Sequence, residues 1–206
     1  MSRQKTPERR RTILDAAREL FGTQGYHCTN IADIAEKLGM GHGTFYRYFK
    51  SKRDIFQQVL NDITGRIMAV AITENPTAAN DLETYRGQVE RIARALFDLF
   101  GEDSATARVF FFEAQGVDEE MRGSIDNAFK VMQQFTARYL ENGVSKGFLK
   151  KDLDVEVISR AINAISFEAI RQTIAAPTPK AKRQEAERWA RGTIVLMFEG
   201  IAAAAP

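Results

Sequence analysis

Cysteine and histidine are scarce in this sequence of 206 residues. The single cysteine, Cys28, excludes an intrachain disulfide and a zinc site built from cysteines. We expect it to be a small packed residue ahead of a helix rather than a redox or metal residue. The two histidines, His27 and His42, lie in one short region of the chain. We therefore expect neither a bound metal nor a cofactor.

Long apolar runs are also absent. No uninterrupted apolar stretch approaches the roughly 18 residues that span a bilayer. The basic start, MSRQKTPERRR, is not followed by the apolar core of a signal peptide. Together with the single cysteine, these absences predict a cytoplasmic protein with no membrane partner.

Catalytic patterns are missing as well. The sequence contains no nucleophile elbow, phosphate-cradling loop, metal-ligand cluster or paired carboxylates that suggest a site. Both histidines lie in or beside the motif described below, which leaves none for the rest of the chain. We therefore predict that the protein is not an enzyme and has no catalytic residues.

Charge is distributed unevenly along the chain. Residues 1–54 contain 11 Lys/Arg and 6 Asp/Glu, whereas residues 55–206 contain 18 Lys/Arg and 21 Asp/Glu. Positive charge concentrated at one end suggests that this end faces an anion, although a fluctuation of solvated surface charge gives the same count.

Apolar spacing predicts helices throughout, so the expected fold is all-α with about nine helices. The first helix should begin at Pro7 after a Thr6 cap and end at Gly22–Gly25. Its polar face is either solvated or lies along a phosphate backbone. The cations of that face are Arg9, Arg10, Arg11 and Arg18.

Two short helices joined by a glycine turn are predicted between Thr29 and Lys52. The apolar positions that hold them together are Ile31, Ile34, Ala35, Leu38, Phe45 and Phe49. This pattern predicts a helix-turn-helix, whose second helix is slim enough to enter the major groove of B-DNA. Ser51 can cap the helix that follows.

The pattern T-N-I-x-D-I-A-x-x-x-G-x-x-x-G-T-F-Y-x-Y-F-x-S-K resembles the DNA-binding domain of TetR-family transcriptional regulators over about residues 10–60. The resemblance implies a three-helix DNA-binding domain, here residues 1–54, and a helical domain for effector binding and dimerisation, here residues 55–206. It also implies a homodimer that binds a palindromic operator in double-stranded DNA.

The family's DNA contacts can be carried over by position. The implied DNA-binding residues are Thr29, Asn30, Gly41, His42, Gly43, Thr44, Tyr46, Arg47, Tyr48 and Lys52. His42, Gly43 and Thr44 would lie at base edges, and most of the others would bind phosphate. Gly41 replaces the common Ser, which removes a hydroxyl contact and a helix cap. Arg53 replaces the frequent Glu and would add positive charge near DNA.

The C-terminal part should contain an effector pocket and a dimer interface. The expected pocket residues are Phe97, Phe100, Arg108, Phe111, Phe112, Phe135, Tyr139, Phe167 and Arg171. Further polar candidates for orienting a ligand are Glu113, Gln115, Asn163 and Glu168. Because pockets are mostly apolar with a few placed polar groups, we expect an apolar or amphipathic effector.

The last two predicted helices, about residues 155–175 and 180–204, should form the dimer interface as a four-helix bundle. The expected interface residues are Ile158, Ile162, Ile165, Trp189, Leu196, Met197 and Gly200. Ordinary intrachain core is the alternative for this stripe. The sequence thus predicts a ligand-responsive regulator, most simply a repressor; the alternative is an architectural DNA-binding protein without ligand control.

Overall fold

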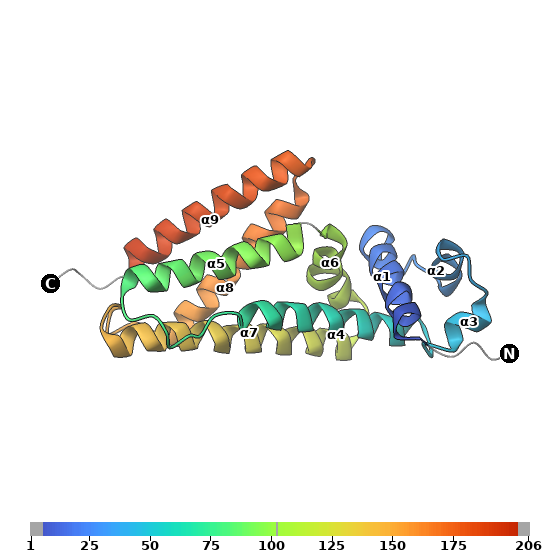
Figure 1. The fold of residues 1–206 in the computed structure, drawn as a ribbon, viewed down its shortest axis with the longest axis horizontal. Helices are drawn as coiled ribbons and strands as arrows, with labels where there is room; N and C mark the ends of the chain where they lie inside the picture. The colour runs from blue at the N-terminus through green and yellow to red at the C-terminus, as the bar shows by residue number, and fades with distance from the viewer. Residues whose placement is uncertain (1–5, 102, 202–206) are drawn as a thin grey trace. The chain divides into compact units, whose positions relative to one another are not determined.

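The computed structural model describes residues 6–101 and 103–201, with side chains up to Phe198, and these residues are helical with no strand (Figure 1). By contacts they divide into two compact units. The first unit comprises the chain up to Gly65 together with Asp103–Ile125, and the second comprises Arg66–Glu102 together with Asp126 onward. The division expected after residue 54 concerns function and stays a prediction.

Helix α1 (Pro7–Gln24) begins as the sequence predicts. The Thr6 hydroxyl accepts a hydrogen bond from Arg9 N at 3.3 Å, and Pro7 occupies the first turn. Helices α2 (Ile31–Lys37) and α3 (His42–Tyr46) follow, and α2 packs on both α1 and α3. Helix α4 (Lys52–Ala71) then begins after Ser51, whose hydroxyl accepts from Asp54 N at 3.0 Å and confirms the predicted cap.

Aromatic rings form much of the core of the first unit. Phe21 meets Phe56 edge-on at a centroid distance of 5.0 Å, and Tyr26 meets Phe56 at 4.7 Å. Phe45 and Phe49 are buried, as predicted, with exposed fractions of 0% and 1%. Each buried aromatic stabilises the fold by about 1.5–3 kcal/mol, so α2 and α3, which are too short to persist alone, are held by this core.

A short irregular helical segment completes the first unit. It comprises α6 (Ser104–Arg108), a π-helical turn η1 (Val109–Glu113) and a 3-10 turn η2 (Ala114–Gly116). Phe110 in this segment is buried, but Phe112 is 48% exposed. Any helical turn packed on one side leaves an outward face, and Phe112 lies on it.

The second unit is built from longer helices: α5 (Leu82–Gly101), most of α7 (Glu119–Lys146), α8 (Val155–Ala175) and α9 (Pro179–Ile201). Helices α5, α8 and α9 pack on one another (Figure 1). The predicted bounds of α8, about residues 155–175, are confirmed. Helix α7 runs through Gly143, on which Leu149 and Phe148 pack, and it ends before Gly147 at φ +81°.

Within the second unit, side chains of α5 and α7 hold the loop between α4 and α5. Gln88 Nε2 donates to Asn75 O at 2.8 Å, and Asn142 Nδ2 donates to Ala79 O at 2.9 Å. Tyr139 Oη donates to Glu74 O at 3.0 Å.

Within the described ranges, no helix is both long and apolar enough to cross a membrane.

Candidate nucleic-acid interface and ligand cavity

The turn between α2 and α3 is made by a glycine in the left-handed region. Gly39 has φ +55°, which a residue with a side chain rarely adopts. The following residue, Met40, donates its backbone N–H to Ala35 O at 2.9 Å and closes the turn. The chain then enters α3 at His42, which gives the predicted helix-turn-helix its form.

Most predicted DNA-binding residues lie on the surface of this motif. Tyr46 is 57% exposed, and Thr44, Arg47 and Tyr48 are partly buried. The other exposed members are Asn30, Gly41, His42 and Gly43. Gly41 precedes α3 and makes no side-chain capping bond, as its substitution for Ser predicts. These positions leave an accessible polar surface; their contacts with DNA stay a prediction.

Thr29 is an exception and corrects a sequence-based expectation. Its side chain is 0% exposed, and its hydroxyl donates to Gly25 O at 2.8 Å. A buried hydroxyl offers phosphate no surface, so Thr29 holds the turn between α1 and α2 instead. Cys28 corrects another expectation, because it is exposed rather than packed.

Lys52 is partly engaged inside the first unit. Its ammonium donates to Tyr26 O at 3.0 Å and lies 4.5 Å from the centroid of the Tyr26 ring. This cation–π contact and the carbonyl bond fix the side chain at the start of α4. Lys52 therefore has a structural role besides its predicted contact with phosphate.

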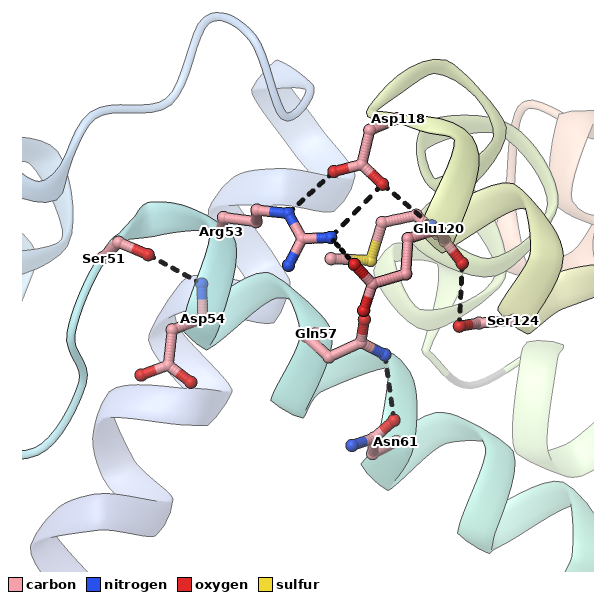
Figure 2. Close-up of polar contacts among 9 residues, drawn as sticks. Ser51, Arg53, Asp54, Gln57, Asn61, Asp118, Glu120 and Ser124 are labelled. Carbon is pink, nitrogen blue, oxygen red and sulfur yellow. Dashed lines mark hydrogen bonds and ion pairs between the residues drawn. The ribbon is translucent and has the colours of Figure 1, made fainter.

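Arg53 does not supply the unpaired positive charge that the sequence suggests (Figure 2). Its Nε donates to Asp118 Oδ2 at 2.8 Å, and its Nη2 donates to Glu120 Oε2 at 2.6 Å. The hydrogen bond from Arg53, followed by that from Met121 N, holds the pKa of Asp118 below its usual range. The expectation was wrong because two carboxylates neutralise this guanidinium.

The basic face of α1 is also tied into the first unit. Arg11 Nη1 lies 2.6 Å from Asp62 Oδ1, and Arg18 Nε lies 3.0 Å from Asp103 Oδ2. Arg10 donates to Gln58 and stacks over the Phe49 ring at 5.4 Å. These partners reduce the charge that the arginines can offer to phosphate, so the solvated-face alternative gains support for Arg11 and Arg18.

The second unit contains a cavity of about 120 Å³ between α5, α7, α8 and α9. Its lining residues are Tyr85, Val89, Ala93, Leu96, Phe97, Thr136, Tyr139, Ile162, Asn163, Ser166, Ala169, Ile170, Ala190, Thr193, Ile194 and Met197. A smaller cavity of about 60 Å³ lies beside it, next to residues 67–71 of α4. Burial raises the pKa of Tyr85 and of Tyr139, so both phenols are neutral near pH 7.

The cavity contains only some of the residues expected for an effector pocket. Phe97 and Tyr139 line the larger cavity, and Phe135 lines the smaller one. Asn163, one of the polar candidates, lines both. Small side chains that line the cavity, such as Ala93 on α5, are the sequence signal that could have indicated it. The residues opposite them lie on three other helices, so the sequence alone does not bring them together.

The other expected pocket residues line neither cavity. Phe100 is buried in the core, and Phe167 stacks on Phe129 with centroids 4.7 Å apart. Arg171 is half exposed and pairs with Glu168 at 2.7 Å. The remaining three belong to the first unit; they are Arg108, Phe111 and Phe112.

The expected dimer residues also divide. Ile162 and Met197 line the cavity; Met197 is buried and Ile162 is partly buried. Leu196 is 59% exposed, while the Trp189 indole is partly buried and donates to Glu185 at 2.9 Å. Ile158 and Ile165 are partly buried, and Gly200 lies outside the residues whose exposure is described.

These features define a helical DNA-binding protein: an N-terminal helix-turn-helix with an exposed polar surface and a separate unit with a largely apolar cavity. Residues 13–59 match the family model "Bacterial regulatory proteins, tetR family". The N-terminal domain of the chain is therefore that of TetR-family transcriptional regulators.

Relatives with assigned names extend the similarity beyond the DNA-binding domain. The transcriptional repressor KstR2 of Mycobacterium tuberculosis is 26% identical over 164 residues, covering 79% of this chain and 80% of that protein. The fatty acid metabolism regulator protein of Bacillus subtilis is 27% identical over 192 residues, covering 92% and 93%. A putative regulator from Saccharomonospora viridis, solved with choline, shares the fold with a TM-score of 0.76 at 21% identity, covering 96% of this chain and all of that one.

Proposed function

We propose that this protein is a ligand-responsive transcriptional repressor that binds a palindromic operator as a homodimer. The observation that carries the proposal is the exposed face at the head of α3, where His42, Gly43 and Thr44 are not covered by the core. A helix of this kind presents its N-terminal residues to base edges in the major groove. Asn30 and Tyr46, both exposed, are placed to bind phosphate beside it.

Dimerisation rests on apolar and small residues that α8 and α9 expose. Val157, with 57% exposure, is followed by Ala161 and Ala164 on α8, while Val195 and Leu196 are at least half exposed on α9. Exposed apolar residues gathered on neighbouring helices are typical of an interface. A dimer with two-fold symmetry matches the two-fold symmetry of a palindromic operator.

Ligand control rests on the largely apolar cavity of the second unit. An effector that binds the free protein more tightly than the DNA-bound protein lowers operator affinity by the same factor. The alternative, an architectural DNA-binding protein without ligand control, leaves this cavity without a function.

Selection of genomic fragments bound by the purified protein, followed by footprinting, tests the proposal. We expect a few enriched fragments, each with two protected half-sites about one helical turn apart or a multiple of it. Uniform recovery of fragments would support the architectural alternative instead.

A further inference from the structure

The cavity of the second unit has an uncharged lining. Neither it nor the smaller cavity is lined by Lys, Arg, Asp, Glu or His. The charged residues of α5 and α9, among them Arg86, Glu90 and Arg183, instead line an open groove that adjoins the cavity at Ala93, Phe97, Ala190 and Ile194. An ion buried without a partner is strongly disfavoured, so this lining selects a neutral molecule.

The two cavities meet at a shared wall. Four residues line both of them: Leu96, Thr136, Tyr139 and Asn163. Of their polar groups, Tyr139 Oη is engaged with Glu74 O at 3.0 Å. Thr136 Oγ1 lies 2.9 Å from Asn163 Oδ1, so one end of the Asn163 amide is held in place.

The other end of this amide is buried without a partner. Asn163 Nδ2 has essentially no accessible surface and makes no hydrogen bond within the described part of the chain. Buried polar atoms are nearly always paired, because an unpaired donor loses its bonds to water without replacement. Because Asn163 lines both cavities, a ligand oxygen that reached this donor would supply the missing partner.

We propose that this cavity binds a neutral, largely apolar molecule whose carbonyl or hydroxyl oxygen accepts a hydrogen bond from Asn163 Nδ2. The inference rests on the proposed effector function and names the chemical class of the effector. An engineered apolar cavity of roughly 150 Å³ holds benzene, so the 120 Å³ cavity accommodates a group close to the size of a six-membered ring. A longer ligand would extend past Leu96 into the smaller cavity.

Three molecules with similar six-membered rings test this assignment. Cyclohexanone carries an oxygen acceptor, methylcyclohexane has no polar group, and cyclohexanecarboxylate carries a negative charge. We expect cyclohexanone to bind and the carboxylate at pH 7 to bind at least about tenfold more weakly, as burial of an unpaired charge requires. The affinities are measured by titration followed by NMR. Absence of cyclohexanone binding, or tighter binding of the carboxylate, would overturn the assignment.

Asn163→Leu keeps the branched heavy-atom skeleton of the side chain and removes the donor. We expect it to weaken cyclohexanone binding roughly two- to tenfold, the effect of one hydrogen bond, and to leave methylcyclohexane binding equal or tighter. Asn127→Leu, at an exposed position of α7, is the matched control and should change neither. Equal loss for both ligands in Asn163→Leu would mean that the amide only maintains the shape of the cavity.

The wild-type protein provides a measurement that does not depend on a variant. In ¹⁵N-labelled protein, the Asn163 side-chain amide protons should move downfield with cyclohexanone and not with methylcyclohexane. The same samples, titrated with operator DNA, separate the two proposals. If cyclohexanone binds through Asn163 but leaves operator affinity unchanged at saturation, the ligand class stands and the effector function fails. If it releases the operator equally in Asn163→Leu, the effector function stands and the role of Asn163 fails.

Discussion

Gly22 of α1 and Ala105 of α6 lie in direct backbone contact: a Cβ atom on residue 22 would stand 2.5 Å from Ala105 Cα. Such a distance lies well inside van der Waals contact, and the obstructing atom belongs to the backbone. The two helices can approach this closely only because residue 22 has no side chain.

Gly22→Ala should therefore destabilise the protein by about 1–3 kcal/mol, as overpacking does in a well-packed core. The matched control is Gly65→Ala in α4, where an added Cβ meets nothing within 4 Å. The control should stabilise by about 0.5–1 kcal/mol, because glycine is unfavourable inside a helix. Urea unfolding of both variants measures the difference. Equal effects of the two substitutions would refute the close approach.

Arg53→Gln should lower the free energy of unfolding near pH 7 and have less effect in acid. Because Arg53 depresses the folded-state pKa of Asp118 below 3.8, the ion pair stabilises the fold above that value and is lost as the pH falls through the folded-state pKa. The difference between wild type and variant should therefore shrink below about pH 4.

Arg160→Gln is the control for Arg53, since Arg160 pairs only with Glu156 on the same exposed helix face in the contacts described. Chemical denaturation from pH 7 to pH 3 follows both variants. A difference for Arg53→Gln that stays constant across this range would show that Asp118 is not its partner in solution.

Thr29→Val should reduce stability by about 0.5–1.5 kcal/mol through loss of the hydroxyl bond to Gly25 O. It should leave the salt dependence of DNA binding unchanged, because a buried side chain neutralises no phosphate. Thermal unfolding and DNA titrations at several salt concentrations report the two effects. If the DNA affinity of the variant depended less steeply on salt concentration than that of the wild type, Thr29 would be a phosphate contact after all.

Thr44→Ala and His42→Ala should change sequence preference, whereas Tyr46→Phe should weaken binding to all sequences alike. A good base contact discriminates by about 1–3 kcal/mol, and a phosphate contact carries no sequence information. Binding to a randomised library separates these results. The assignment of α3 as the reading helix fails if the first two variants keep the wild-type preference.

Leu196→Glu should convert the dimer to monomer and weaken operator binding, because it places a charge on an exposed apolar face of α9. Ile72→Glu, at a residue that is 66% exposed beyond the end of α4, should leave the oligomeric state unchanged. Sedimentation velocity measures both. A wild-type protein that sediments as a monomer would exclude the proposed interface.

The sequence predicts local features well where one pattern determines them. The caps at Thr6 and Ser51, the glycine turn at Gly39 and the buried faces of Phe45 and Phe49 all follow from neighbouring residues. These features depend on spacing and on backbone preferences, which a single sequence contains.

Contacts between distant segments could not be predicted. The partners of Arg53 lie 65 and 67 residues away, and nothing local distinguishes Asp118 from the other acids of the chain. The cavity is likewise made by four helices, so aromatic content near Phe111 and Phe112 was a poor guide to its lining. Thr29 was predicted to contact phosphate because its position matches the family pattern. That pattern does not show whether the hydroxyl is buried.

The affinity of the full-length protein for a selected genomic fragment and for a scrambled duplex of the same length, measured at one salt concentration, tests sequence-specific regulation most directly. We predict that the selected fragment binds at least about a thousandfold more tightly, as specific regulators do. Equal affinity for the two duplexes would contradict the account and leave an architectural DNA-binding protein.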